Sequence, residues 1–162
     1  MSCGLAIAAA LLIGDPSVVT QAIATPIVAP PTTLAQEPLY ADIVSRSQAL
    51  KGVVDAWIAA GAAQNEGFAQ TPEFASFRTE AAALSERDMA GHIDLRERGT
   101  DGDLRCILRG LSEDLTRRVT DVAEATDERT RADALSELSY MLNDNVEVIT
   151  SPPGPTAGTP PF

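Results

Sequence analysis

The sequence of 162 residues predicts an all-α fold, an antiparallel up-down-up-down four-helix bundle with disordered N- and C-terminal segments. Three observations lead to this prediction. Between residues 37 and 150 the apolar residues recur at intervals of three and four, which is the helical period. Short connections join the segments with this period, and short connections make neighbouring helices antiparallel. No segment alternates apolar and polar residues over a sustained run, so we expect no β-sheet.

The first two helices are defined by their apolar positions and by their end signals. The first covers residues 37–64 and is expected to end at Asn65 and Gly67. Its apolar positions are Leu39, Ile43, Leu50, Val54, Trp57 and Ile58. The second begins after Thr71, which can act as the N-cap, and ends near Gly99. Its apolar positions are Phe74, Phe77, Ala81 and Leu84.

The third helix has the clearest amphipathic pattern of the four. Its apolar residues form one narrow stripe and are Leu104, Leu108, Leu111, Leu115, Val119 and Val122. Asp101 or Asp103 is expected to cap its first turn. The fourth helix opens near Asp127, and Pro152 and Pro153 prevent its continuation. Its apolar positions are Ala134, Leu135, Leu138, Leu142, Val146 and Ile149.

The two ends of the chain differ in composition from the helical middle. Residues 4–13 are uncharged and apolar, a run far shorter than the roughly 20 residues of a membrane-spanning helix but of the length of a signal-peptide core. We interpret residues 1–24 as a signal peptide, although no Lys or Arg precedes the run, and a second small-x-small sequence would allow cleavage at residue 35. Residues 25–36 then form a Pro/Thr/Ala linker, and residues 151–162 form a Pro-rich disordered tail. The mature protein would be periplasmic or secreted, or cytoplasmic if this segment is not a signal.

The net charge excludes two classes of partner. Asp and Glu outnumber Lys and Arg by 23 to 12, which gives a formal charge of −11 at pH 7. A nucleic-acid-binding protein needs a basic face that displaces counterions from phosphates. The same acidity disfavours attachment to anionic lipid. We therefore expect no nucleic-acid partner, and the short length of the apolar run predicts no stable membrane span in the mature form.

The residues that could carry chemistry gather in residues 91–106, which hold the single histidine of the chain, His92. Asp88 precedes His92 by one helical turn and could orient it as a base, but no nucleophile shares their face, so we predict no catalytic residues. Zinc sites need more Cys and His ligands than the chain offers, so we predict no metal site. The arginines nearby are interpreted as a lattice of exposed salt bridges with acidic residues four positions away. The expected pairs are Asp94–Arg98, Asp101–Arg105, Arg109–Glu113, Glu113–Arg117 and Asp114–Arg118.

Cys106 is the remaining cysteine if residues 1–24 are removed, so an intramolecular disulfide is excluded. It lies about 200° around its helix from Leu104. We therefore expect its thiol to point away from the core and from His92, either as an unpartnered surface cysteine or as an intermolecular contact with a protein partner or a second copy.

These observations favour a small exported, non-enzymatic helical-bundle protein. It would act through protein–protein contacts in the cell envelope, in an accessory, adaptor or immunity-type role.

A bundle that binds a small molecule or haem between its helices is the alternative interpretation. The candidate residues for such a site are His92, Met89, Met141 and Trp57. The sequence lacks a Cys-x-x-Cys-His motif, which excludes standard covalent attachment of haem. In the expected topology Met141 lies roughly 13 Å from the level of His92 along the bundle, which is too far for both to bind one iron.

Overall fold

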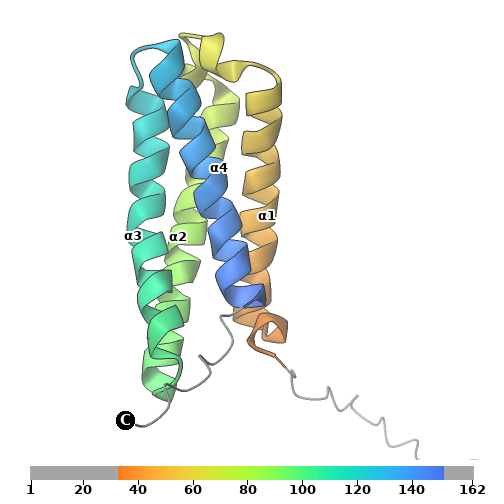
Figure 1. Ribbon diagram of the computed structural model, residues 1–162, viewed down its shortest axis with the longest axis vertical. Coiled ribbons are helices and arrows are strands. Elements are labelled where there is room, and N and C mark those ends of the chain that lie inside the picture. Colours follow the sequence, from red (N-terminus) through yellow and green to blue (C-terminus); the bar gives the residue numbers. More distant parts are fainter. Residues whose placement is uncertain (1–32, 152–162) are drawn as a thin grey trace, which may run out of the picture. The chain divides into compact units, whose positions relative to one another are not determined.

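The computed structural model describes residues 33–151, and these residues form the predicted four-helix bundle (Figure 1). Successive helices run in opposite directions, which confirms the up-down-up-down topology, and residues 33–151 contain no strand. The helices are α1 (Pro38–Ala59), α2 (Pro72–Arg98), α3 (Gly102–Glu124) and α4 (Glu128–Thr150), with the short 3-10 turns η1 (Leu34–Gln36), η2 (Ala62–Gln64) and η3 (Phe68–Gln70). The predicted signal peptide, residues 25–32 of the predicted linker and residues 152–162 of the predicted tail lie outside the described residues.

Most helix ends follow the local signals in the sequence. The side chain of Thr71 accepts a hydrogen bond from the first turn of α2, and Gly99 ends that helix with a φ of +66°. Asp101, and not Asp103, caps α3. Asp127 caps α4. Side chains that accept from these otherwise unpaired backbone N–H groups stabilise the helix starts.

The first helix is shorter than predicted. It ends at Ala59, because Gly61 adopts a left-handed conformation with φ +70° and turns the chain into η2. This conformation is accessible to glycine at little cost. Asn65 does not end the helix. Its side chain accepts from the N–H of Gly67 at 2.9 Å and shapes the connection to α2.

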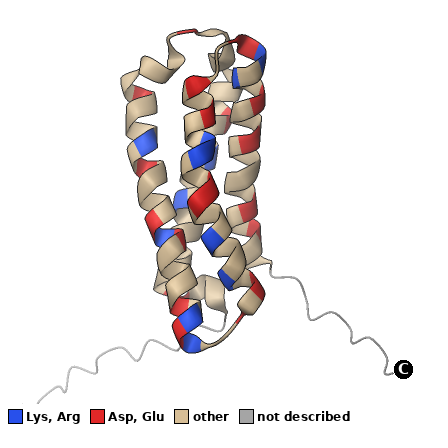
Figure 2. Cartoon of the chain, turned by 90° about the vertical axis from the view of Figure 1, so that its left-hand side faces the viewer, with Lys and Arg blue, Asp and Glu red and all other residues tan. Residues whose placement is uncertain are grey.

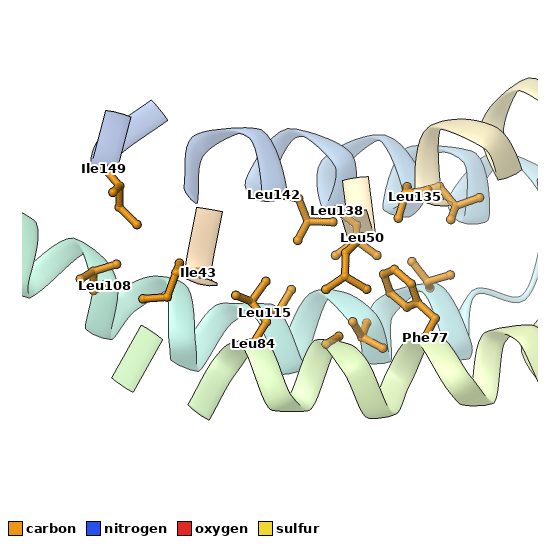
Figure 3. Packing of buried hydrophobic residues seen from close by; sticks show 14 of the residues in the cluster. Ile43, Leu50, Phe77, Leu84, Leu108, Leu115, Leu135, Leu138, Leu142 and Ile149 are labelled. Carbon is orange, nitrogen blue, oxygen red and sulfur yellow. The ribbon is translucent and has the colours of Figure 1, made fainter. Parts of the chain in front are cut away.

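Leucine, isoleucine and phenylalanine side chains from all four helices fill the core (Figure 3). The predicted apolar stripe of α2 is buried throughout, and those of α3 and α4 are buried at most positions. Several residues depart from the prediction, including the following four. Tyr40 is fully buried, Ile58 is 41% exposed, and Ser112 takes the core position next to the half-buried Leu111. These residues stand at the borders of their stripes, where a small rotation of the helix decides which side chain faces inward.

The two sides of α2 pack differently against their neighbours. Toward α3 the contact is close and uses small side chains, and Ser85 Oγ donates to the carbonyl oxygen of Ser112 at 2.8 Å. Toward α1 polar and charged pairs connect the two helices, and we name this contact the α1–α2 seam. Its pairs are Arg87–Asp42 (3.1 Å), Arg46–Glu80 (3.6 Å), Arg98–Glu37 and the hydrogen bond from Tyr40 to Asp94 (2.7 Å).

Gly91 permits the close approach of α2 to both neighbouring helices. A Cβ at this position would lie 3.0 Å from Leu108 Cδ1, and 3.4 Å from side-chain atoms of Ile43 and Tyr40. We expect Gly91→Ala to lower the free energy of unfolding by about 1 kcal/mol, because overpacking exceeds the gain in helix propensity. Urea denaturation measures this change. Gly52→Ala is the control in the middle of α1, where a Cβ meets no atom within 4 Å. It should stabilise the protein by about 0.5–1 kcal/mol, and equal effects of both substitutions would contradict the packing argument.

Candidate functional site

A groove between α2 and α3 brings together most of the chemically distinctive residues of the sequence. It has a volume of about 590 Å³, and we name it the basic groove. Cys106 is exposed there, as predicted. His92 also lines this groove, although no hydrogen bond joins it to Cys106. Its lining residues are His92, Arg96, Arg105, Cys106, Arg109, Gly110 and Glu113.

His92 connects the two walls of the basic groove. Its Nδ1 lies 2.8 Å from the carbonyl oxygen of Arg105, so Nδ1 carries the proton and donates. The ring is thereby held between α2 and α3, and Nε2 has no partner among residues 33–151. The sequence-based pairing of His92 with Asp88 does not occur, because Asp88 points into the core and bonds to α4.

The arginines of the basic groove are not neutralised as the sequence predicted. Arg109 does pair with Glu113, at 2.9 Å. Arg105 does not pair with Asp101, because the Asp101 carboxylate caps α3 by accepting from a backbone N–H. Within residues 33–151, the guanidinium groups of Arg96 and Arg105 have neither an ion pair nor a hydrogen-bond partner.

The other predicted salt bridges are formed in part. Arg98 pairs with Asp94 at 2.9 Å, as expected. Asp114 pairs with Arg117 at 2.7 Å, three positions away, and not with Arg118. Arg118 instead lies 3.5 Å from Glu137 of α4. Two of the five predicted pairs are therefore formed, Asp94–Arg98 and Arg109–Glu113, and the other three are not, because their members bind other groups or, as with Arg105, stay unpaired.

The basic groove thus carries positive charge on an acidic protein. Three arginines and one glutamate among its lining residues give a formal local charge of 3 − 1 = +2, whereas the whole chain has −11. Figure 2 faces the α2–α3 side of the bundle and shows basic segments among acidic ones. Beyond its first turn α4 has acidic residues and no Lys or Arg. The basic groove is therefore a local exception to the surface charge.

A buried polar contact lies deeper in the bundle, between α2 and α4. Asp88 is fully buried, and the side-chain amide of Asn145 donates to its two carboxyl oxygens at 3.1 and 3.0 Å. Burial raises the pKa of Asp88 to about 7, although the hydrogen bond from Asn145 opposes this shift. Asn145 Oδ1 is buried without a partner among the described residues. Sequence reasoning missed this contact, although an asparagine three residues after the core residue Leu142 was a usable signal.

The structure does not bring the candidate haem residues into one site. The Asp88–Asn145 contact fixes the level of α2 against α4. Met141 precedes Asn145 by four residues and His92 follows Asp88 by four, so these two lie eight residues or about 12 Å apart along the bundle. Met89 is half-buried on α2.

Trp57 lies far from His92, in a cluster of aromatic rings near the start of α2. Its ring centroid is 5.0 Å from that of Phe68, 6.0 Å from Phe74 and 4.9 Å from Phe77. Phe77 precedes His92 by fifteen residues on the same helix, which is about 22 Å. Trp57 therefore has a packing role at one end of the bundle, and haem or small-molecule binding stays a prediction from the sequence.

Comparisons with protein families, curated proteins and solved structures gave no match. In the part of the chain that the structure describes, no three His, Cys, Asp or Glu side chains are grouped so that they could hold a metal ion. None of the helices within residues 33–151 has the length and hydropathy required to cross a membrane.

Proposed function

We propose that this protein is a small exported helical bundle without catalytic activity, which binds another protein in the cell envelope through the basic groove. Its role would be that of an accessory, adaptor or immunity-type protein. The observation that carries this proposal is the pair of uncompensated guanidinium groups, Arg96 and Arg105, on a chain with a net charge of −11. Arginine is enriched at protein interfaces, and unpaired surface charge that meets a complementary surface provides specificity and fast association.

The positions of the polar residues support binding over catalysis. A hydrolytic site would combine a nucleophile with a base and a carboxylate that orients the base. Here the carboxylate of Asp88 bonds to Asn145 in the core, and His92 uses Nδ1 on a backbone carbonyl. The exposed thiol of Cys106 lies beside the arginines, where it is available for contact with a partner.

The packing of η1 bears on the export part of the proposal. Leu34 and Ala35, just before the start of α1, pack against the hydrophobic core. Removal of residues 1–24 would leave this contact intact. Cleavage at residue 35 would cut η1 and remove two packed side chains. We therefore favour cleavage after Ala24 in the proposed mature protein.

Affinity capture from an envelope fraction, with the tagged full chain as bait, tests the proposed function. The wild type should retain a specific protein, and the double substitution Arg96→Glu and Arg105→Glu should lose it. The matched control is Arg78→Glu with Arg129→Glu, which changes the charge equally at two exposed arginines outside the basic groove. Identical captured proteins for both double variants would contradict the proposal.

The same capture experiment tests the contribution of Cys106. It is repeated with and without reductant, and with Cys106→Ser. A partner or second copy that is lost on reduction and on this substitution is held through the thiol. Retention in both cases would show that Cys106 is a surface cysteine that forms no covalent link.

A further inference from the structure

We propose that the basic groove recognises the carboxylates of an acidic protein segment, with Arg96 and Arg105 as the two side chains that bind them. This inference rests on the proposed function and states what the partner must present. The planar guanidinium group donates two parallel hydrogen bonds and fits a carboxylate in this bidentate way. One such side chain stands on each wall of the basic groove, Arg96 on α2 and Arg105 on α3.

The local structure keeps both arginines free for an external carboxylate. The acidic residue one turn before Arg105 is Asp101, whose carboxylate accepts from the N–H of Leu104 at 3.1 Å and is committed to the start of α3. One turn before and one turn after Arg96 the sequence has His92 and Thr100, neither of which is acidic. No described acidic side chain forms an ion pair with either arginine.

The rest of the basic groove is arranged in advance of binding. Arg109 and Glu113 neutralise each other at 2.9 Å, which concentrates the remaining positive charge on the two free arginines. The hydrogen bond from His92 to the Arg105 carbonyl oxygen links the two helices that carry them. At Gly110 a Cβ would meet no atom within 4 Å, so this part of the wall is open to a ligand. A site that is already ordered loses less entropy on binding.

The surroundings of the basic groove favour an acidic protein segment over other polyanions. A nucleic-acid backbone or an anionic bilayer would extend beyond it onto a surface where acidic residues are in excess. A short segment with two or three Asp or Glu residues places its charge on the arginines alone.

Fluorescence anisotropy with the purified full chain at low ionic strength tests the inference. The probe is a labelled peptide of alternating Glu and Gly, and the control peptide has Gln in place of Glu. We expect the Glu peptide to bind and the Gln peptide not to bind. Binding should weaken as salt is added, because salt screens exposed charges. Arg96→Gln with Arg105→Gln should weaken it at least tenfold, whereas Arg78→Gln with Arg129→Gln should leave it unchanged.

A lysine variant separates charge from geometry. Arg96→Lys with Arg105→Lys keeps the charge but removes the planar fork, so we expect affinity between those of the wild type and the glutamine variant. Circular dichroism confirms that each variant is folded. Equal binding by the wild type and the glutamine variant would overturn the inference. Displacement of the peptide by inorganic phosphate at lower concentration than by acetate would also overturn it, in favour of a phosphate site.

The result can be separated from that of the proposed function. If the envelope partner is captured through the basic groove but the Glu peptide does not bind, the inference fails and the protein-binding function stands. If the peptide binds but no partner depends on the basic groove, the proposed function fails. Sedimentation tests whether a second copy of the chain occupies the basic groove. If the wild type is a dimer, and the double substitution Arg96→Gln with Arg105→Gln makes it a monomer, the inference is overturned in favour of a second copy.

Discussion

Replacement of Asp88 by Asn should stabilise the protein relative to the wild type increasingly as the pH rises, with a change on the order of 4 kcal/mol between pH 4 and pH 8. Burial raises the pKa of Asp88 in the folded protein to about 7, whereas the ordinary value is 3.8. Below the ordinary value the carboxyl is protonated in both states and has no effect. As the pH rises from about 4 to about 7, the unfolded chain releases this proton while the folded protein retains it. The wild type therefore loses stability over this range.

An asparagine at position 88 fits the same space and does not titrate. Its amide can donate to Asn145 Oδ1, which is buried without a partner among residues 33–151, while its oxygen accepts from the Asn145 amide. The measurement is urea denaturation of both proteins between pH 4.5 and pH 8. The difference between their free energies of unfolding should widen as the pH rises. The other titrating groups are the same in both proteins, so this change reports on Asp88 alone. A difference that is independent of pH would show that Asp88 has an ordinary pKa in the folded protein.

Arg131→Met is expected to lower the free energy of unfolding by about 2–3 kcal/mol. Arg131 is 4% exposed, although it stands in the first turn of α4. Its guanidinium group donates to the carbonyl oxygen of Ala63 at 2.6 Å and to that of Ala125 at 2.9 Å. One side chain therefore joins the α1–α2 connection to the end of α3. Methionine keeps the apolar stem but leaves both carbonyls without this donor.

The neighbouring Arg129 provides a control for the Arg131 substitution. It stands in the same helical turn and is exposed, so Arg129→Met should change the free energy of unfolding by no more than about 0.5 kcal/mol. Urea denaturation at pH 7 compares the two variants with the wild type. Losses of equal size would mean that the stability depends on charge near the start of α4 and not on the two hydrogen bonds of Arg131.

The parts of the fold that the sequence predicted are those decided by neighbours in the chain. Thr71, Gly99 and Asp127 act within one helical turn of their own positions, so the ends of α2 and the start of α4 could be predicted. The apolar stripes predicted the helix count and most of the core for the same reason. Gly61 is the counterexample, because helical periodicity continues past it while its left-handed conformation turns the chain.

The parts that escaped prediction depend on contacts between helices or on competition for one group. Asn145 meets Asp88 only because α4 lies at a particular level beside α2. Spacing alone assigned Asp101 to Arg105, but the carboxylate binds a backbone N–H of α3 and leaves the arginine free. This competition between a helix cap and a salt bridge decides the charge of the basic groove, and a count of residues four apart does not show it.

The α1–α2 seam has a consequence for how the bundle opens. Its ion pairs lie near the surface and weaken with salt, whereas the close contact between α2 and α3 relies on small side chains. Partial unfolding should therefore separate α1 from α2 first. All the side chains of the basic groove belong to the hairpin of α2 and α3. The basic groove would thus keep its side chains together when α1 separates from α2. Binding of the partner would then not depend on this partial unfolding.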